Sequence, residues 1–260
     1  MFRRILKSIF PFAVFAACLA FGYMPRSAVP ALAQAGKAIG LYGYSSIVNG
    51  IWIAVPILAL TIRRVSLKSA LSDLGILTNP LRPFLFAFIA TSPALIGFAL
   101  TAHVDHLITP RAFFVLCIWS PFAEEVLFRA FAFGQLYRRA GWNFWVATLV
   151  PTIFFAAAHA FQPSDAGELA GILAITALGS VLFSYFFVRL GWTIWAPFAL
   201  HALLNTWWTV FTTNQTALGG LSDNIFRFGS IGLALGLAAA ASFTPALRFL
   251  VPEKGAWRAA

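Results

Sequence analysis

Residues 121–131 read PFAEEVLFRAF, and this stretch decides how the chain folds. Two adjacent carboxylates, Glu124 and Glu125, and the cation Arg129 lie within a run of residues that is otherwise suited to lipid. A charged side chain at the centre of a bilayer helix costs about 2.5–3.5 kcal/mol, so such groups face the interior of a helical bundle and usually have a function. The stretch therefore predicts a polar site enclosed by transmembrane helices.

The composition indicates a membrane protein. The 260 residues are 60% hydrophobic and 10% charged, with a mean hydropathy of +0.84, whereas soluble domains carry about 25% charged residues. The formal net charge of +10 does not indicate a nucleic-acid partner, because the basic residues are scattered singly or in pairs between apolar runs. We predict an all-α, polytopic transmembrane bundle that forms a single domain over residues 1–260 and contacts the lipid bilayer.

Apolar stretches of about 20 residues, which are long enough to cross a bilayer, give eight candidate spans. The first is the weakest, because it is short and precedes ALAQA, a possible signal-peptide cleavage site. Eleven residues that include Arg26 and two prolines separate the apolar run from that site, so we favour a retained span. The candidate spans are residues 10–24, 38–62, 83–102, 112–137, 143–161, 167–188, 192–211 and 226–247.

The distribution of basic residues predicts the orientation. With the N-terminus inside, the inner segments hold thirteen Lys and Arg residues and the outer segments hold four. The positive-inside rule therefore favours two cytoplasmic termini. We expect an integral protein of a bacterial inner (plasma) membrane. The inner residues are Arg3, Arg4, Lys7, Arg63, Arg64, Lys68, Arg82, Arg138, Arg139, Arg189, Arg248, Lys254 and Arg258, and the outer ones are Arg26, Lys37, Arg111 and Arg227.

The spacing of the charges divides their roles. Glu125 and Arg129 are four residues apart, with the acid first, which is the favourable order for a helical ion pair. Glu124 points about 100° away from Glu125 and is left without this partner. Pro121 removes one backbone hydrogen bond and crowds the carbonyl of Cys117, so we expect a bend just before the acids.

Two other spans carry polar groups. His159 follows Phe155 by four residues in FFAAAHA, and His201 and Asn205 share one helix face in HALLN. A lone histidine in an apolar helix is usually a packed core residue, but two histidines, an amide and a free carboxylate together indicate chemistry or ion transfer. One conflict remains at this level: the orientation places His159 near the outer face, whereas Glu124 and His201 are near mid-depth.

These groups match amide hydrolysis. A glutamate that has lost most of its water can act as a general base with a neutral histidine beside it, and a second histidine and an amide can donate hydrogen bonds to an oxyanion. The sequence has no GxSxG or HExxH motif and no pair of intramembrane aspartates. A membrane transporter or proton relay, or a non-catalytic scaffold of the bacteriocin-immunity type, remain alternatives.

Three motifs in order, EEVLFR (124–129), FAAAH (155–159) and HALLN (201–205), resemble EExxxR, FxxxH and HxxxN of the CAAX-protease and bacteriocin-processing (CPBP, Abi-type) intramembrane endopeptidases. The resemblance covers residues 121–205, within a motif core of about 112–211, and has no departure at any motif position. It implies an endopeptidase that cleaves a membrane-associated or lipidated peptide. It assigns water activation to Glu124 and His159, oxyanion stabilisation to His201 and Asn205, and structural support to Glu125 and Arg129.

A zinc ion is a possible alternative to a metal-free mechanism. Glu124, His159 and His201 form a set of two histidines and one glutamate that leaves a position for water. If Glu124 bound the metal, however, only Glu125 would remain as a base, and Glu125 is expected to pair with Arg129. We therefore favour a glutamate mechanism without a metal or other cofactor.

Overall fold

The computed structural model describes residues 2–40, 42–64, 66–161, 165–211 and 218–250. Within these residues every regular element is helical, and a single isolated β-bridge joins Val104 to Phe211. This confirms the predicted all-α class. Lys254 and Arg258, which contribute to the predicted orientation, lie outside the described residues, and the orientation itself stays a prediction.

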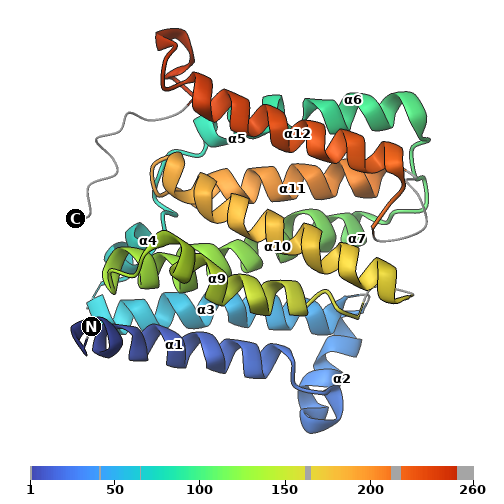
Figure 1. Ribbon diagram of the computed structural model, residues 1–260. Coiled ribbons are helices and arrows are strands. Elements are labelled where there is room, and N and C mark those ends of the chain that lie inside the picture. The colour runs from blue at the N-terminus through green and yellow to red at the C-terminus, as the bar shows by residue number, and fades with distance from the viewer. Residues whose placement is uncertain (1, 41, 65, 162–164, 212–217, 251–260) are drawn as a thin grey trace.

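The long helices lie side by side and run across the molecule in one general direction (Figure 1). The elements are α1 (Phe2–Gly22), η1 (Arg26–Ala28), α2 (Pro30–Ile39), α3 (Gly43–Arg64), α4 (Leu67–Asp73), α5 (Leu81–Ala90), α6 (Ser92–Thr101), α7 (Pro110–Phe114), η2 (Val115–Trp119), α8 (Ser120–Glu124), η3 (Glu125–Phe133), η4 (Gln135–Arg139), α9 (Phe144–Ala157), α10 (Ala166–Arg189), α11 (Trp195–Val210), α12 (Leu221–Ala240) and η5 (Pro245–Leu247).

The elements from α7 to η4 form the centre of the bundle. The η3 helix packs against α1, α3, α9 and α10, while α11 packs against η2, α8 and α5. All nine residues of η3 are buried, from Glu125 to Phe133. The charged residues Glu125 and Arg129 are therefore enclosed by other helices, as the cost of exposing a charge to lipid requires.

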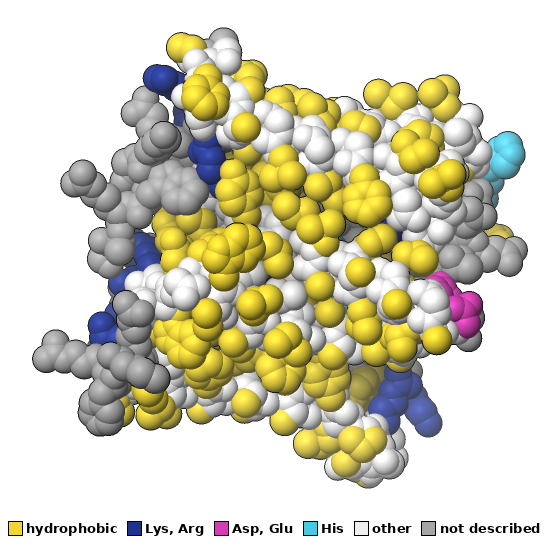
Figure 2. Space-filling view, in the orientation of Figure 1, with side chains coloured by type: hydrophobic (Ala, Val, Ile, Leu, Met, Phe, Trp, Pro, Cys, Tyr) yellow, Lys and Arg dark blue, Asp and Glu magenta, His cyan; other side chains and the backbone are white. Residues whose placement is uncertain are grey.

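The surface is that of a membrane protein. Hydrophobic side chains cover the middle of the face in Figure 2, and Lys and Arg side chains lie toward its left edge and its lower right corner. Three described helices, α1, α3 and α10, are long and apolar enough to cross a bilayer, and α5 with α6, bent by 44°, can count as a fourth. The count of eight spans is not confirmed, and the single domain stays a prediction.

The helix that carries the two acids is wound more loosely than an α-helix. The η2, η3 and η4 segments are π-helical, with hydrogen bonds that join residues i and i+5, and α8 and Gly134 between them are α-helical. Pro121 lies in the first turn of α8, and the helix continues beyond it into the π-helical η3. Such π segments are rare and are often found at functional sites.

The structure resolves the depth conflict for His159. Glu124 lies 15 residues before Arg139, where η4 ends, and His159 lies 15 residues after Phe144, where α9 begins. Both side chains line the same cavity, so they lie at a similar depth in the bundle. The α9 helix has only 14 residues and ends at Ala157, so the expectation that residues 143–161 form a complete span is not confirmed.

A close backbone contact positions the start of α11. Gly75 has φ +71°, and a Cβ atom there would overlap the carbonyl oxygen of Trp192. One turn further along, the Trp195 Nε1 donates to the Ile76 carbonyl at 3.0 Å. The loop after α4 therefore holds the loop that leads into α11, the helix that carries His201 and Asn205.

This contact leads to a stability prediction. We expect Gly75→Ala to destabilise the protein by about 1–3 kcal/mol, because it combines a strained positive φ with a steric overlap. Gly232→Ala in α12 is the control, because a Cβ there meets nothing within 4 Å and alanine favours a helix by about 1 kcal/mol. Thermal unfolding in detergent would measure both, and equal unfolding temperatures for the two variants would contradict the prediction.

Candidate active site

A cavity of about 690 Å³ in the middle of the bundle brings the predicted residues together. Its wall includes Glu124, His159, His201 and Asn205, which come from α8, the turn after α9, and α11. Most of the remaining wall is apolar, with tryptophan, phenylalanine, leucine and isoleucine side chains from α3, α10, α11 and α12. An apolar cavity with a few convergent polar groups is the usual form of a binding or active site.

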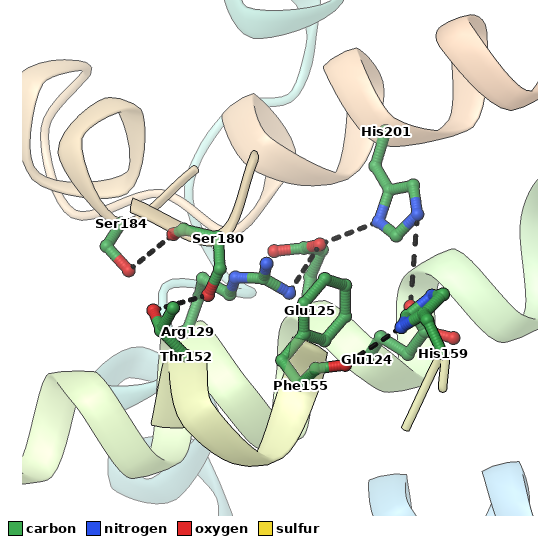
Figure 3. A network of polar contacts seen from close by, with 9 residues as sticks. All are labelled: Glu124, Glu125, Arg129, Thr152, Phe155, His159, Ser180, Ser184 and His201. Atoms are coloured by element: carbon green, nitrogen blue, oxygen red, sulfur yellow. Dashed lines mark hydrogen bonds and ion pairs between the residues drawn. The ribbon is translucent and has the colours of Figure 1, made fainter. Parts of the chain in front are cut away.

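Glu125 is the most enclosed polar group beside this cavity. Its side chain is 0% exposed, and its Oε1 accepts from the Arg129 Nη1 at 3.0 Å. The predicted pair is therefore present. The same oxygen also accepts from the His201 Nδ1 at 2.8 Å, a contact that the sequence did not predict. Figure 3 shows the Glu125 carboxylate between the Arg129 guanidinium and the His201 ring.

Two aromatic rings enclose the Arg129 guanidinium. Its carbon lies 4.1 Å from the centre of the Phe155 ring and 5.3 Å from that of Phe183. A cation over an aromatic face is stabilised by the ring quadrupole, and more so when water is excluded. Phe155 in α9 and Phe183 in α10 thus help to keep a charge inside an apolar bundle.

Glu124 faces the cavity, and the described part of the chain gives it no partner comparable to Arg129. Its side chain is 20% exposed, and its Oε2 lies 3.8 Å from the His201 Nε2. Because the His201 Nδ1 faces a carboxylate oxygen, this nitrogen carries a proton. The Nε2 of His201 is then the atom that faces Glu124 and the cavity.

His159 is held by a carbonyl group at the end of α9. The backbone N–H of His159 donates to the Ala156 carbonyl, three residues earlier. The Phe155 carbonyl is therefore left for the His159 Nδ1, which lies 2.8 Å away. This is a common way to satisfy a carbonyl in the last turn of a helix. In the neutral ring the Nε2 then carries no proton and can accept a hydrogen bond.

Asn205 satisfies a carbonyl that Pro121 leaves unpaired. In η2 the Ser120 N–H donates to the Val115 carbonyl, five residues earlier. In the same register the Leu116 carbonyl would need an N–H at position 121, which proline lacks. The Asn205 Nδ2 donates to this carbonyl at 3.1 Å instead, so one of its two N–H bonds is used and the other remains.

Comparison with known proteins agrees with this site. Residues 107–207 match the family described as type II CAAX prenyl endopeptidase Rce1-like. This region is therefore similar to the Rce1-like family. A segment of 97 residues is 33% identical to the Bacillus subtilis (strain 168) protein named "Putative membrane peptidase YdiL", and the match covers 37% of this chain and 35% of that protein. No solved structure has significant similarity to the chain.

The side chains of the cavity also bear on the zinc alternative. No group of three His, Cys, Asp or Glu side chains is arranged to hold a metal ion, as far as the described residues go. Of the three expected zinc ligands, His201 and His159 each use their Nδ1 for a protein partner, at Glu125 and at the Phe155 carbonyl, which leaves the Nε2 of each ring. Metal-binding histidines usually donate their other ring N–H to a carboxylate or a carbonyl in the same way, so the preference for a mechanism without a metal stays a prediction.

Three polar or aromatic contributions were missed in the sequence. The spacing of Phe155 from His159 was noted, but not that its ring covers Arg129. Phe183 lies on a helix with no motif, so no pattern pointed to it. Asn49 in α3 donates to Ser120 beside the cavity, and a single amide within the apolar run of residues 47–60 is a signal that could have found it.

The Asn205 contact in the Rce1-like region predicts a coupled effect on stability. We expect Asn205→Ala to cost about 1–3 kcal/mol, because it leaves the Leu116 carbonyl unpaired. In a Pro121→Ala background the cost should be smaller, because alanine restores the backbone N–H at position 121. Unfolding in detergent of the wild type, Asn205→Ala, Pro121→Ala and the double variant gives the coupling free energy between the two positions. Equal costs in the two backgrounds would show that Asn205 does not replace the missing donor.

Proposed function

We propose that this protein is an intramembrane endopeptidase that hydrolyses a peptide bond of a membrane-associated or lipidated peptide. One observation supports this most strongly: a single apolar cavity brings a free carboxylate, two histidines and an amide together from three separate segments. The match of residues 107–207 to the Rce1-like family gives independent support. The matched part covers 35% of its peptidase relative, so the activity of the whole chain rests on this proposal.

The first step is the activation of water. Water between Glu124 and His159 donates one proton to the carboxylate and one hydrogen bond to the His159 Nε2, which is free because Nδ1 is bonded to the Phe155 carbonyl. As the water oxygen bonds to the peptide carbon, Glu124 takes the first proton. When the C–N bond breaks, Glu124 gives that proton to the leaving amine, so the carboxylate is restored.

The second requirement is to stabilise the negative oxygen of the tetrahedral intermediate. His201 Nε2 and the remaining N–H of Asn205 are the proposed donors. For His201 to donate from Nε2, both of its ring nitrogens must carry protons, since Nδ1 already donates to Glu125. The Glu125 carboxylate then lies beside the positive ring and offsets its charge, while Arg129 balances the carboxylate.

Substitution of Glu124 tests the proposed activity. We expect Glu124→Ala to reduce cleavage by at least about 100-fold, since it removes the general base. Peptides from membranes that contain the wild-type protein should include cleavage products that are missing with Glu124→Ala. Asp105→Asn is the control, because Asp105 is a carboxylate in a loop outside the cavity.

The same comparison separates the rival functions. A proton relay or transporter predicts a flux that depends on Glu124 with no difference in the peptides. A scaffold predicts that Glu124→Ala and His159→Ala leave the cellular phenotype intact. Either result, with a variant that is folded and inserted, would contradict the peptidase.

A glutamate mechanism also predicts independence from metal. We expect cleavage by the purified protein to be unchanged after treatment with EDTA and 1,10-phenanthroline, because Glu124 serves as the base and not as a ligand. Metal analysis of the same preparation gives the zinc content. A loss of activity that added Zn²⁺ restores would overturn this mechanism while leaving the peptidase proposal in place.

A further inference from the structure

One polar contact on the cavity wall is not used in the mechanism above. Asn49 in α3 is 6% exposed, and its Nδ2 donates to the Ser120 Oγ at 2.7 Å. Ser120 is the first residue of α8 and lies four residues before Glu124, so the two side chains share one face of the helix. Asn49, Ser120 and Glu124 all line the same cavity.

The Asn49 amide restricts where the Ser120 hydroxyl can donate. A serine hydroxyl has one proton to donate and can accept at its oxygen, where Asn49 already binds. A serine in a helix often donates to the carbonyl four residues earlier, which here is Leu116. That carbonyl receives the Asn205 amide instead. The described residues give the Ser120 hydroxyl no acceptor, so its proton is available to the cavity.

We propose that the Ser120 hydroxyl is a further hydrogen-bond donor to the oxyanion and that Asn49 is its positioning residue. The Leu116 carbonyl brings the two donors together, because it binds the Asn205 amide at 3.1 Å and precedes Ser120 by one helical turn. As the water oxygen bonds to the peptide carbon, the negative charge moves to the former carbonyl oxygen. Ser120 donates a hydrogen bond to this oxygen and keeps its proton.

This inference rests on the proposed peptidase function and adds a residue outside the three motifs. Asn205 uses one N–H for the Leu116 carbonyl, so it can offer one donor to the oxyanion. A second donor from the same helix as the general base would share the developing charge. Loss of a single oxyanion donor in hydrolases costs about 100- to 1,000-fold in kcat. Loss of the Ser120 hydroxyl should lower kcat by less than this, because the Asn205 amide still donates to the oxyanion.

The test uses the full-length protein in lipid vesicles. The probe is a library of palmitoylated, internally quenched decapeptides, and the member that wild-type protein cleaves fastest is used for kinetics. We expect Ser120→Ala to lower kcat about 10- to 100-fold with KM within about threefold, and Ser120→Thr to retain most of kcat because it keeps the hydroxyl. Ser184→Ala is the control, since Ser184 is a buried helical serine outside the cavity.

Asn49→Ala tests the positioning. We expect a smaller loss of kcat than for Ser120→Ala, and no further loss when Asn49→Ala is added to Ser120→Ala, because Asn49 acts through the hydroxyl. Thermal unfolding of each variant separates this positioning role from a purely structural one. If the Asn49–Ser120 bond only linked α3 to α8, its loss would lower the unfolding temperature and leave kcat unchanged.

The outcomes distinguish the two proposals. If wild-type protein cleaves the probe, Glu124→Ala does not, and Ser120→Ala cleaves at the wild-type rate, the role of Ser120 is overturned and the peptidase stands. If the losses from Asn49→Ala and Ser120→Ala multiply, Asn49 does not act through Ser120. If wild-type cleavage of the library does not depend on Glu124, the proposed function fails, and the inference fails with it.

Discussion

The buried carboxylate of Glu125 is the group on which the arrangement of the site depends. One of its oxygens accepts from Arg129 on its own helix and from His201 on α11, so a single atom links two helices and orients a histidine ring. Removing one partner from such a group would leave an uncompensated charge in an apolar interior, at about 3–5 kcal/mol. Its other oxygen and two Arg129 nitrogens have no hydrogen-bond partner among the described residues. A site with this cost is better explained by function than by stability.

Unpaired backbone carbonyls orient the other two polar side chains. In a bundle surrounded by lipid, no bulk water is available to satisfy a free carbonyl, so a side chain must do so. Pro121 with the π register exposes the Leu116 carbonyl, and the tight last turn of α9 exposes that of Phe155. Asn205 and His159 bind these two groups. The irregular helix geometry and the positions of the candidate catalytic residues therefore have a common physical cause.

The sequence predicted local pairings better than contacts between helices. The ion pair of Glu125 with Arg129 follows from a four-residue spacing within one helix, and the structure contains it. The bond from His201 to Glu125 joins residues 76 positions apart and depends on how α11 packs, which hydropathy does not report. The depth of His159 was misjudged because an apolar run of 19 residues contains a helix of only 14. The π register also escaped prediction, since part of what stabilises it comes from Asn205 on another helix.

Three polar side chains line the same cavity as Glu124, and each uses part of its hydrogen-bonding capacity for a protein partner. His201 and His159 each commit Nδ1 to the protein, and Asn205 commits one N–H, which leaves one nitrogen position of each directed to the cavity. This division fixes the protonation of each Nδ1 and the rotation of each ring, because the protein partner in each case is an acceptor. Little reorganisation is then needed when charge develops in the cavity, and preorganisation of this kind is the largest contribution that most enzymes make to their rate. Among the described residues, Glu124 has no such partner within hydrogen-bond distance. The fold therefore holds the groups around Glu124 still and leaves this carboxylate free to exchange a proton.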